Sequence, residues 1–77
     1  MKKARNGSKY VVCVKNRGYR VSLIRRRLYR VLPDSQAEKH GLLRVVDESG
    51  EDYLYPQSLF IALEIPRSAE RVLAQAT

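Results

Sequence analysis

The sequence predicts one small, mainly β domain built from five short strands. Two observations predict it: short runs of β-forming residues recur along the chain, and glycine or proline separates most of them. With 77 residues the chain has room for a single domain. Because an open sheet would leave unpaired edges, we expect the strands to curl into a small barrel.

Three runs in the first half favour strands. Residues 10–14 are dense in β-forming side chains and are followed by a turn-forming Asn16, so they are predicted to form the first strand. Residues 19–24 alternate between apolar and polar side chains, which is typical of a strand with one buried face. Residues 28–32 form the third run, and Pro33 ends it because proline has no amide hydrogen to donate.

Residues 34–41 have a helical signature instead. Ser35 and Glu38 have the spacing of a capping box, and Gly41 is suited to the left-handed position after a helix. We therefore expect a short helical turn near residues 35–40, inserted between strands.

The second half predicts a hairpin, a last strand and a short helix. Residues 42–46 and 52–55 are expected to pair around a turn in which Gly50 supplies a positive φ. Residues 59–63 form the last strand-like run, and a short helix is expected over residues 68–75.

The predicted organisation is a flexible basic arm over residues 1–8, a barrel over 9–65 and a short C-terminal helix or tail over 66–77. The predicted core comprises Val12, Val14, Val21, Leu23, Val31, Val45, Tyr55, Phe60 and Ile61.

The order of these elements resembles a Src-homology-3-type (SH3-like) barrel. Residues 21–32 resemble its diverging turn and second strand, residues 43–55 around Ser49-Gly50 resemble its distal hairpin, and residues 55–60 resemble its proline-containing 3₁₀ turn. The resemblance covers residues 9–64 and implies a five-stranded SH3-like barrel.

The chain departs from the peptide-binding members of this fold. Those proteins hold proline-rich peptides with a Trp, several Tyr and an acidic loop. This chain has no Trp, its corresponding loop over residues 16–27 is basic, and Leu59 stands where a groove Tyr is expected. Recognition of proline-rich peptides is therefore not expected, and function has to be argued from individual side chains.

Charge is distributed unevenly along the chain. Residues 1–30 carry eleven Lys or Arg and no acidic residue, whereas residues 31–77 carry four basic and eight acidic residues, for a net charge of +7. Ion pairs between the two parts can neutralise some of the positive charge but not all of it. A basic region therefore remains on the surface and favours an anionic partner.

Three consecutive arginines, Arg25-Arg26-Arg27, form the clearest candidate binding motif in the sequence. A planar guanidinium binds carboxylates and phosphates through several parallel N–H donors. The candidate partner-binding residues are Arg17, Tyr19, Arg20, Arg25, Arg26 and Arg27.

We expect a binding module that docks an acidic protein through this basic face. The alternative is RNA or DNA binding through phosphate contacts, with Tyr19 stacking on a base. The eight acidic residues favour the protein partner, because they would repel a wrapped nucleic acid.

No pattern predicts catalysis, a cofactor or a metal site. His40 is the only histidine and Cys13 the only cysteine, and no spacing brings them together as a nucleophile and base. The acidic residues around Gly50 lack the alternating ligands of a calcium loop. A lone cysteine is typical of a reducing cytoplasm, and the apolar runs are too short to span a membrane. We therefore expect a cytoplasmic, non-enzymatic protein with no membrane partner.

Overall fold

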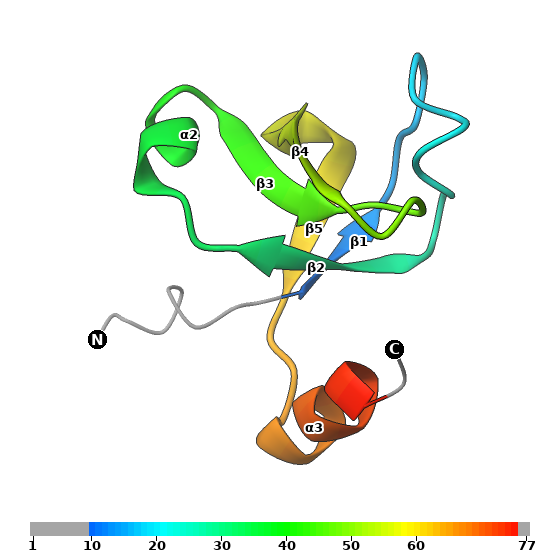
Figure 1. The fold of residues 1–77 in the computed structure, drawn as a ribbon, viewed down its shortest axis with the longest axis vertical. Helices are drawn as coiled ribbons and strands as arrows, with labels where there is room; N and C mark the ends of the chain where they lie inside the picture. The colour runs from blue at the N-terminus through cyan, green and yellow to red at the C-terminus, as the bar shows by residue number, and fades with distance from the viewer. Residues whose placement is uncertain (1–9, 76–77) are drawn as a thin grey trace.

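The computed structural model describes residues 10–75, which form an antiparallel five-stranded sheet and short helices (Figure 1). The strands are β1 (Tyr10–Cys13), β2 (Leu28–Leu32), β3 (Leu42–Val46), β4 (Asp52–Pro56) and β5 (Phe60–Leu63). The helices are α2 (Ser35–Lys39), the 3₁₀ turn η1 (Gln57–Leu59) and α3 (Arg67–Gln75). The prediction of a mainly β chain with two short helices is confirmed, whereas the predicted arm over residues 1–8 lies outside the described residues.

The sheet has the strand order β4-β3-β2-β1-β5 and is bent at β2. The first half of β2 pairs with β1, and its second half, Val31 and Leu32, pairs with β3. Because β2 changes partner along its length, β3 and β4 fold back over the other strands in Figure 1. The strand pairs among the described residues leave β4 and β5 at the two ends, so they do not close the sheet into a barrel.

The core lies inside this bend. Its buried side chains are Val11, Cys13, Leu23, Tyr29, Val45, Tyr55, Leu59 and Phe60, with Val31 and Leu43 packed against them. The predicted core positions Leu23, Val45, Tyr55 and Phe60 are confirmed, and Val31 packs against the core as a partly buried side chain.

The prediction was wrong about which face of β1 is buried. Val11 and Cys13 face the core, whereas the predicted core residues Val12 and Val14 are only half-buried. Val12 pairs with Ile61 across β1 and β5, so both side chains lie on the outer face, and Ile61 is 54% exposed. A shift of one residue in a strand moves every side chain to the opposite face, which explains the error at Val12 and Val14. In β5 the prediction placed both Phe60 and Ile61 in the core, but successive residues of a strand point to opposite faces, and only Phe60 is buried.

Residues 19–24 form turns rather than the predicted strand. The amides of Ser22 and Leu23 both donate to the carbonyl of Tyr19, at 3.0 and 2.9 Å, so the chain turns tightly here. Leu23 is fully buried and holds the turn against the core, whereas Val21 is 95% exposed and is wrongly placed in the predicted core.

The predicted helical turn is confirmed in α2, but a different residue caps it. Asp34, not Ser35, accepts a hydrogen bond from the amide of Ala37 at 3.0 Å. The other oxygen of Asp34 accepts from Arg44 at 2.8 Å, which connects the helix to β3. Gly41 and Gly50 have the predicted positive φ, at 74° and 88°.

The turn between β3 and β4 is organised by a buried carboxylate. Asp47 accepts hydrogen bonds from the amide and hydroxyl of Ser49, at 2.8 and 2.5 Å, and from the Tyr55 hydroxyl at 2.6 Å. Burial acts to raise the pKa of Asp47, but the hydrogen bonds from Ser49 and Tyr55 outweigh it, so the pKa lies below its usual value. Asp47 is therefore ionised in the folded protein at neutral pH.

We expect Phe60→Ala to lower the free energy of unfolding by about 3–5 kcal/mol, because it removes a buried ring from the core. The matched control is Ile61→Ala on the outer face of the same strand, which should cost much less because Ile61 is 54% exposed. Urea unfolding of both variants tests this. Equal losses would show that Phe60 is not a core residue.

The depressed pKa of Asp47 predicts a loss of stability in acid. A carboxyl whose folded pKa lies below its unfolded value stabilises the fold above the unfolded pKa and stops doing so as pH falls through the folded value. Asp47→Asn should therefore be less stable than the wild type at neutral pH, and the difference should shrink as pH falls from about 4 through the lowered pKa of Asp47. Urea unfolding at several pH values measures this, with Glu51→Gln in the same turn as control. A difference that does not depend on pH would contradict it.

Candidate interaction surface

The segment between β1 and β2, residues 14–27, is here called the arginine loop, and it carries all six candidate binding residues. All six are exposed. In Figure 1 this segment, blue to cyan, projects beyond the sheet. The structure therefore brings the predicted residues together on one element.

Both ends of the arginine loop are fixed by backbone hydrogen bonds. At its start, the amides of Val14 and Lys15 donate to the carbonyl of Leu59, at 2.8 and 3.2 Å. At its end, Cys13 exchanges two bonds with the arginine run: its amide donates to Arg27 at 3.0 Å, and its carbonyl accepts from Arg26 at 2.6 Å. The loop is thus tied to the buried part of β1 and to η1.

The arginine run lies in a turn that places one arginine in a strained conformation. The amide of Arg27 donates to the carbonyl of Ile24 at 3.2 Å, and Arg26, at the third position of the turn, has φ 72°. Glycine is usual at such a position, and a side chain there costs about 1–2 kcal/mol. Arg26 is the only non-glycine residue with a positive φ in the described chain.

Few of the arginines have acidic partners. Arg27 pairs with Glu48 at 3.2 Å, and Arg44 pairs with Asp34 and Asp52; these are the ion pairs among the described side chains. Within residues 10–32, the arginines without a carboxylate partner among the described side chains are Arg17, Arg20, Arg25, Arg26 and Arg30. Folding thus pairs one arginine of the run and leaves its two neighbours without such a partner.

Glu48 connects the arginine loop to the turn between β3 and β4. Its carboxylate accepts from Arg27 and from the Tyr29 hydroxyl at 2.5 Å, and its amide donates to the carbonyl of Ser22 at 3.0 Å. The Tyr29 oxygen in turn accepts from the amide of Ile24 at 2.7 Å. Burial and the bond to Glu48 raise the pKa of Tyr29, so its hydroxyl remains a donor. This link could not be predicted from the sequence, because it joins residues far apart in the chain.

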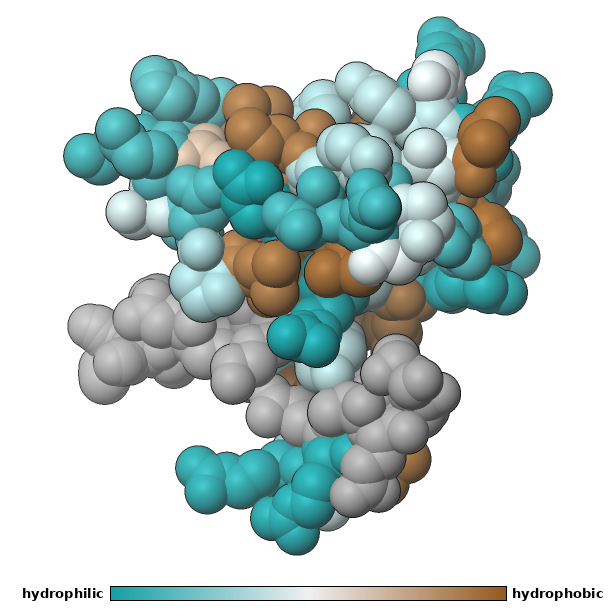
Figure 2. Space-filling view, viewed as in Figure 1, coloured by the Kyte–Doolittle hydropathy of each residue, from teal (hydrophilic) through white to brown (hydrophobic). Residues whose placement is uncertain are grey.

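Apolar side chains are exposed beside the arginines. Val21 is 95% exposed, Ile24 42% and Tyr19 37%. Figure 2 shows brown side chains among teal ones on the side of the molecule where the arginine loop lies. A surface that combines arginine, tyrosine and aliphatic side chains has the composition of a protein–protein interface. The sequence analysis missed Val21 and Ile24 because it assigned them to a strand.

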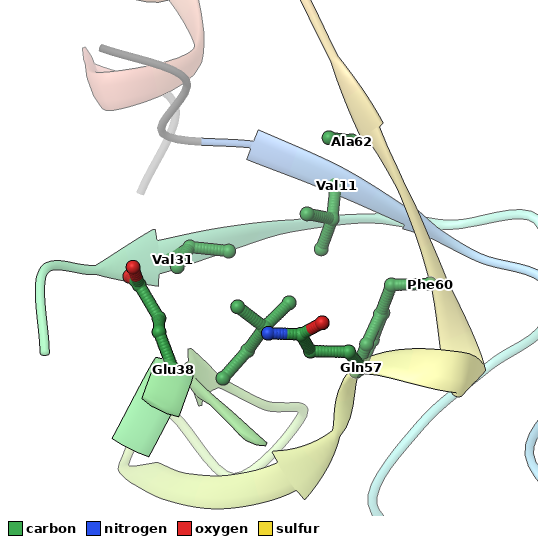
Figure 3. A pocket seen from close by; sticks show the side chains of 7 residues that line it. Val11, Val31, Glu38, Gln57, Phe60 and Ala62 are labelled. Atoms are coloured by element: carbon green, nitrogen blue, oxygen red, sulfur yellow. The ribbon is translucent and has the colours of Figure 1, made fainter. Parts of the chain in front are cut away.

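A separate pocket of about 310 Å³ lies away from the arginine run (Figure 3). It is lined by the apolar side chains Val11, Val31, Leu43, Phe60 and Ala62, with Glu38 and Gln57 as its polar members. None of the six candidate residues lines it, so the predicted basic surface and this pocket are different features.

Cys13 and His40, the one cysteine and the one histidine of the sequence, lie in different environments. Cys13 is fully buried, and burial raises the pKa of its thiol, which disfavours the reactive thiolate. His40 is exposed just after α2, where its amide caps the helix. Within residues 10–75, no group of three or more His, Cys, Asp or Glu is arranged to hold a metal ion. No helix in the same part of the chain has the length and apolar composition needed to cross a bilayer.

A scan against protein-family models, a search of curated proteins and a search of solved structures each find no significant match to this chain.

We expect Arg26→Gly to stabilise the protein relative to Arg25→Gly. Both substitutions remove an arginine and add the same flexibility to the unfolded chain, but only position 26 has a positive φ. Relief of strain should leave Arg26→Gly about 1 kcal/mol more stable than its neighbour. Thermal and urea unfolding of the two variants tests this. Equal stabilities would show that Arg26 carries no strain.

Proposed function

We propose that this chain is a non-enzymatic binding module that docks an acidic segment of a protein partner on the arginine loop. The observation that carries the proposal is the exposed Arg25-Arg26 pair, held in a strained turn without a carboxylate partner among the described residues. We also propose that the bent sheet is an SH3-like barrel, as the order of its elements suggests.

Charge supports an anionic partner. Residues 10–32 contain seven basic residues and no acidic one, and every one of the seven is exposed. Exposed ion pairs contribute only about 0–1 kcal/mol to folding, so this charge does little for stability. Its physical effect is to attract a negatively charged partner and orient it.

The surroundings of the arginines support a protein rather than a nucleic acid. Val21 makes almost no contact with its own chain, and a partner gains free energy by covering it. Phosphates would gain nothing from Val21 or Ile24.

The fixed shape of the loop supports tight docking. Leu23 is fully buried, and Glu48 bonds to the Ser22 carbonyl and to the Arg27 side chain. The two ends of the arginine loop are hydrogen-bonded to β1 and η1. A loop that is already ordered loses less conformational entropy on binding than a flexible one.

The test compares two probes: a short synthetic peptide of alternating Glu and Leu, and single-stranded oligothymidylate. The double variant Arg25→Ser, Arg26→Ser should bind the peptide about tenfold more weakly at an ionic strength of about 0.01 M and lose less at about 0.15 M, because salt screens the field. Val21→Ser should also weaken peptide binding. Fluorescence polarisation with labelled probes measures each affinity.

The control is Arg30→Ser, which removes one exposed arginine on β2 outside the loop. An equal loss for each arginine removed, in the control and in the double variant, would show that net charge, not the arginine loop, drives binding. Tighter binding of oligothymidylate that is insensitive to Val21→Ser would favour a nucleic-acid module instead.

A further inference from the structure

A second pocket, here called the tyrosine pocket, lies between the arginine loop and the β3–β4 hairpin and has a volume of about 390 Å³. It is lined by Tyr19, Ser22, Asp47, Ser49, Tyr53, Leu54 and Tyr55. The arginine run does not line it. Tyr19 and Ser22 belong to the arginine loop, so the pocket adjoins the surface that supports the proposed function but does not include its arginines.

Three tyrosine rings shape the tyrosine pocket. Tyr55 is buried, is anchored by its hydrogen bond to Asp47, and meets Tyr19 edge to face with ring centroids 5.2 Å apart. Tyr19 is 37% exposed and Tyr53 is 50% exposed. One ring is thus fixed by the core, and two others are accessible to a ligand.

The charge at the tyrosine pocket is negative. Asp47 is the only charged residue among its seven lining residues, and its hydrogen bonds from Ser49 and Tyr55 keep it ionised. Glu51 adds a second carboxylate at the rim, where it accepts a hydrogen bond from the Tyr53 hydroxyl at 3.1 Å. No lysine or arginine lines the pocket, although Arg20 neighbours Tyr19 in sequence.

We propose that the tyrosine pocket binds a cationic side chain, Arg or Lys, from a protein partner. The negative face of an aromatic ring attracts a cation, and the attraction strengthens where water is partly excluded. Carboxylates beside the rings complement the same charge. A nucleotide fits this site poorly, because its phosphate would approach Asp47 and Glu51.

This inference does not depend on the proposed function, since the two surfaces select opposite charges. A partner segment with acidic residues at the arginine loop and a basic residue at the tyrosine pocket would satisfy both. Such a partner would be positioned in one orientation only, because reversing it would bring like charges together.

The experiment titrates the full chain with an N-acetylated Gly-Arg-Gly amide peptide and follows backbone amide shifts by NMR. The control peptide replaces Arg with citrulline, which has nearly the same shape and no charge. We expect the arginine peptide to shift the amides of Ser49, Tyr53 and Leu54 and to bind at least about fivefold more tightly than the citrulline peptide.

Variants at Tyr53 separate the contribution of the ring from that of its hydroxyl. Tyr53→Ala should abolish the response, whereas Tyr53→Phe should retain it because the ring face remains; the ring is half exposed, so both variants should fold. The double variant Arg25→Ser, Arg26→Ser should bind the arginine peptide as the wild type does.

Equal binding of the citrulline peptide, wild-type binding by Tyr53→Ala, or tighter binding of uridine monophosphate at the same amides would each overturn the inference. These outcomes leave the proposed function untouched, because that proposal is tested with an acidic peptide and with the arginine loop variants.

Discussion

The surface features of this domain depend on two adjacent carboxylates at the turn between β3 and β4. Glu48 bonds to Arg27, Tyr29 and the backbone of Ser22, and so holds the arginine loop against the hairpin. Asp47 accepts a hydrogen bond from the Tyr55 hydroxyl, and the Tyr55 ring packs edge to face against Tyr19 of the arginine loop. Without these bonds, the long connection between β1 and β2 would be ordered only by buried Leu23, by hydrogen bonds within the loop such as Asn16 to the Leu23 carbonyl, by the bond from the Ile24 amide to the Tyr29 hydroxyl, and by its terminal hydrogen bonds. Ordering such a segment costs about 1–2 kcal/mol per residue, so several tertiary contacts are needed to fix it.

The arrangement of this loop explains why strain is tolerated at Arg26. Its amide is bonded to the carbonyl of Cys13, and the next residue is held by Glu48, so the turn is determined from both sides. A glycine would adopt the same backbone more easily. The backbone bond to Cys13 and the pairing of Arg27 with Glu48 therefore determine the conformation of the turn. The side chain of Arg26 is not needed for that conformation and supplies a positive charge at the surface.

Much of the fold could be predicted from local chemistry, and the errors have a common physical origin. Gly41 and Gly50 have the positive φ predicted for them, and β2 ends just before Pro33, because these features depend on the residue itself. The face of β1 could not be predicted, because residues 10–14 are apolar on both sides and alternation gives no phase. In residues 19–24 the alternation of Val21 and Leu23 imitated a strand, whereas only Leu23 reaches the core. The basic character of the arginine loop could be predicted because charge is visible in the sequence. The contacts of Glu48 and Tyr29 and the tyrosine pocket could not, because they depend on residues that are distant in the chain.

The two surfaces lie side by side because one loop contributes to both. The arginine loop supplies Arg25 and Arg26 at one end and Tyr19 and Ser22 to the tyrosine pocket nearer its middle. Asp47 and Glu48 are consecutive, yet Asp47 lines the pocket while Glu48 faces Arg27. A domain of 77 residues has little interior from which to build a deep site, so recognition has to come from rigid surface loops. The same hydrogen bonds that stabilise the loop also keep a positive and a negative surface at a fixed separation. That fixed separation is what would allow a small module to discriminate a partner by its pattern of charge rather than by total charge alone.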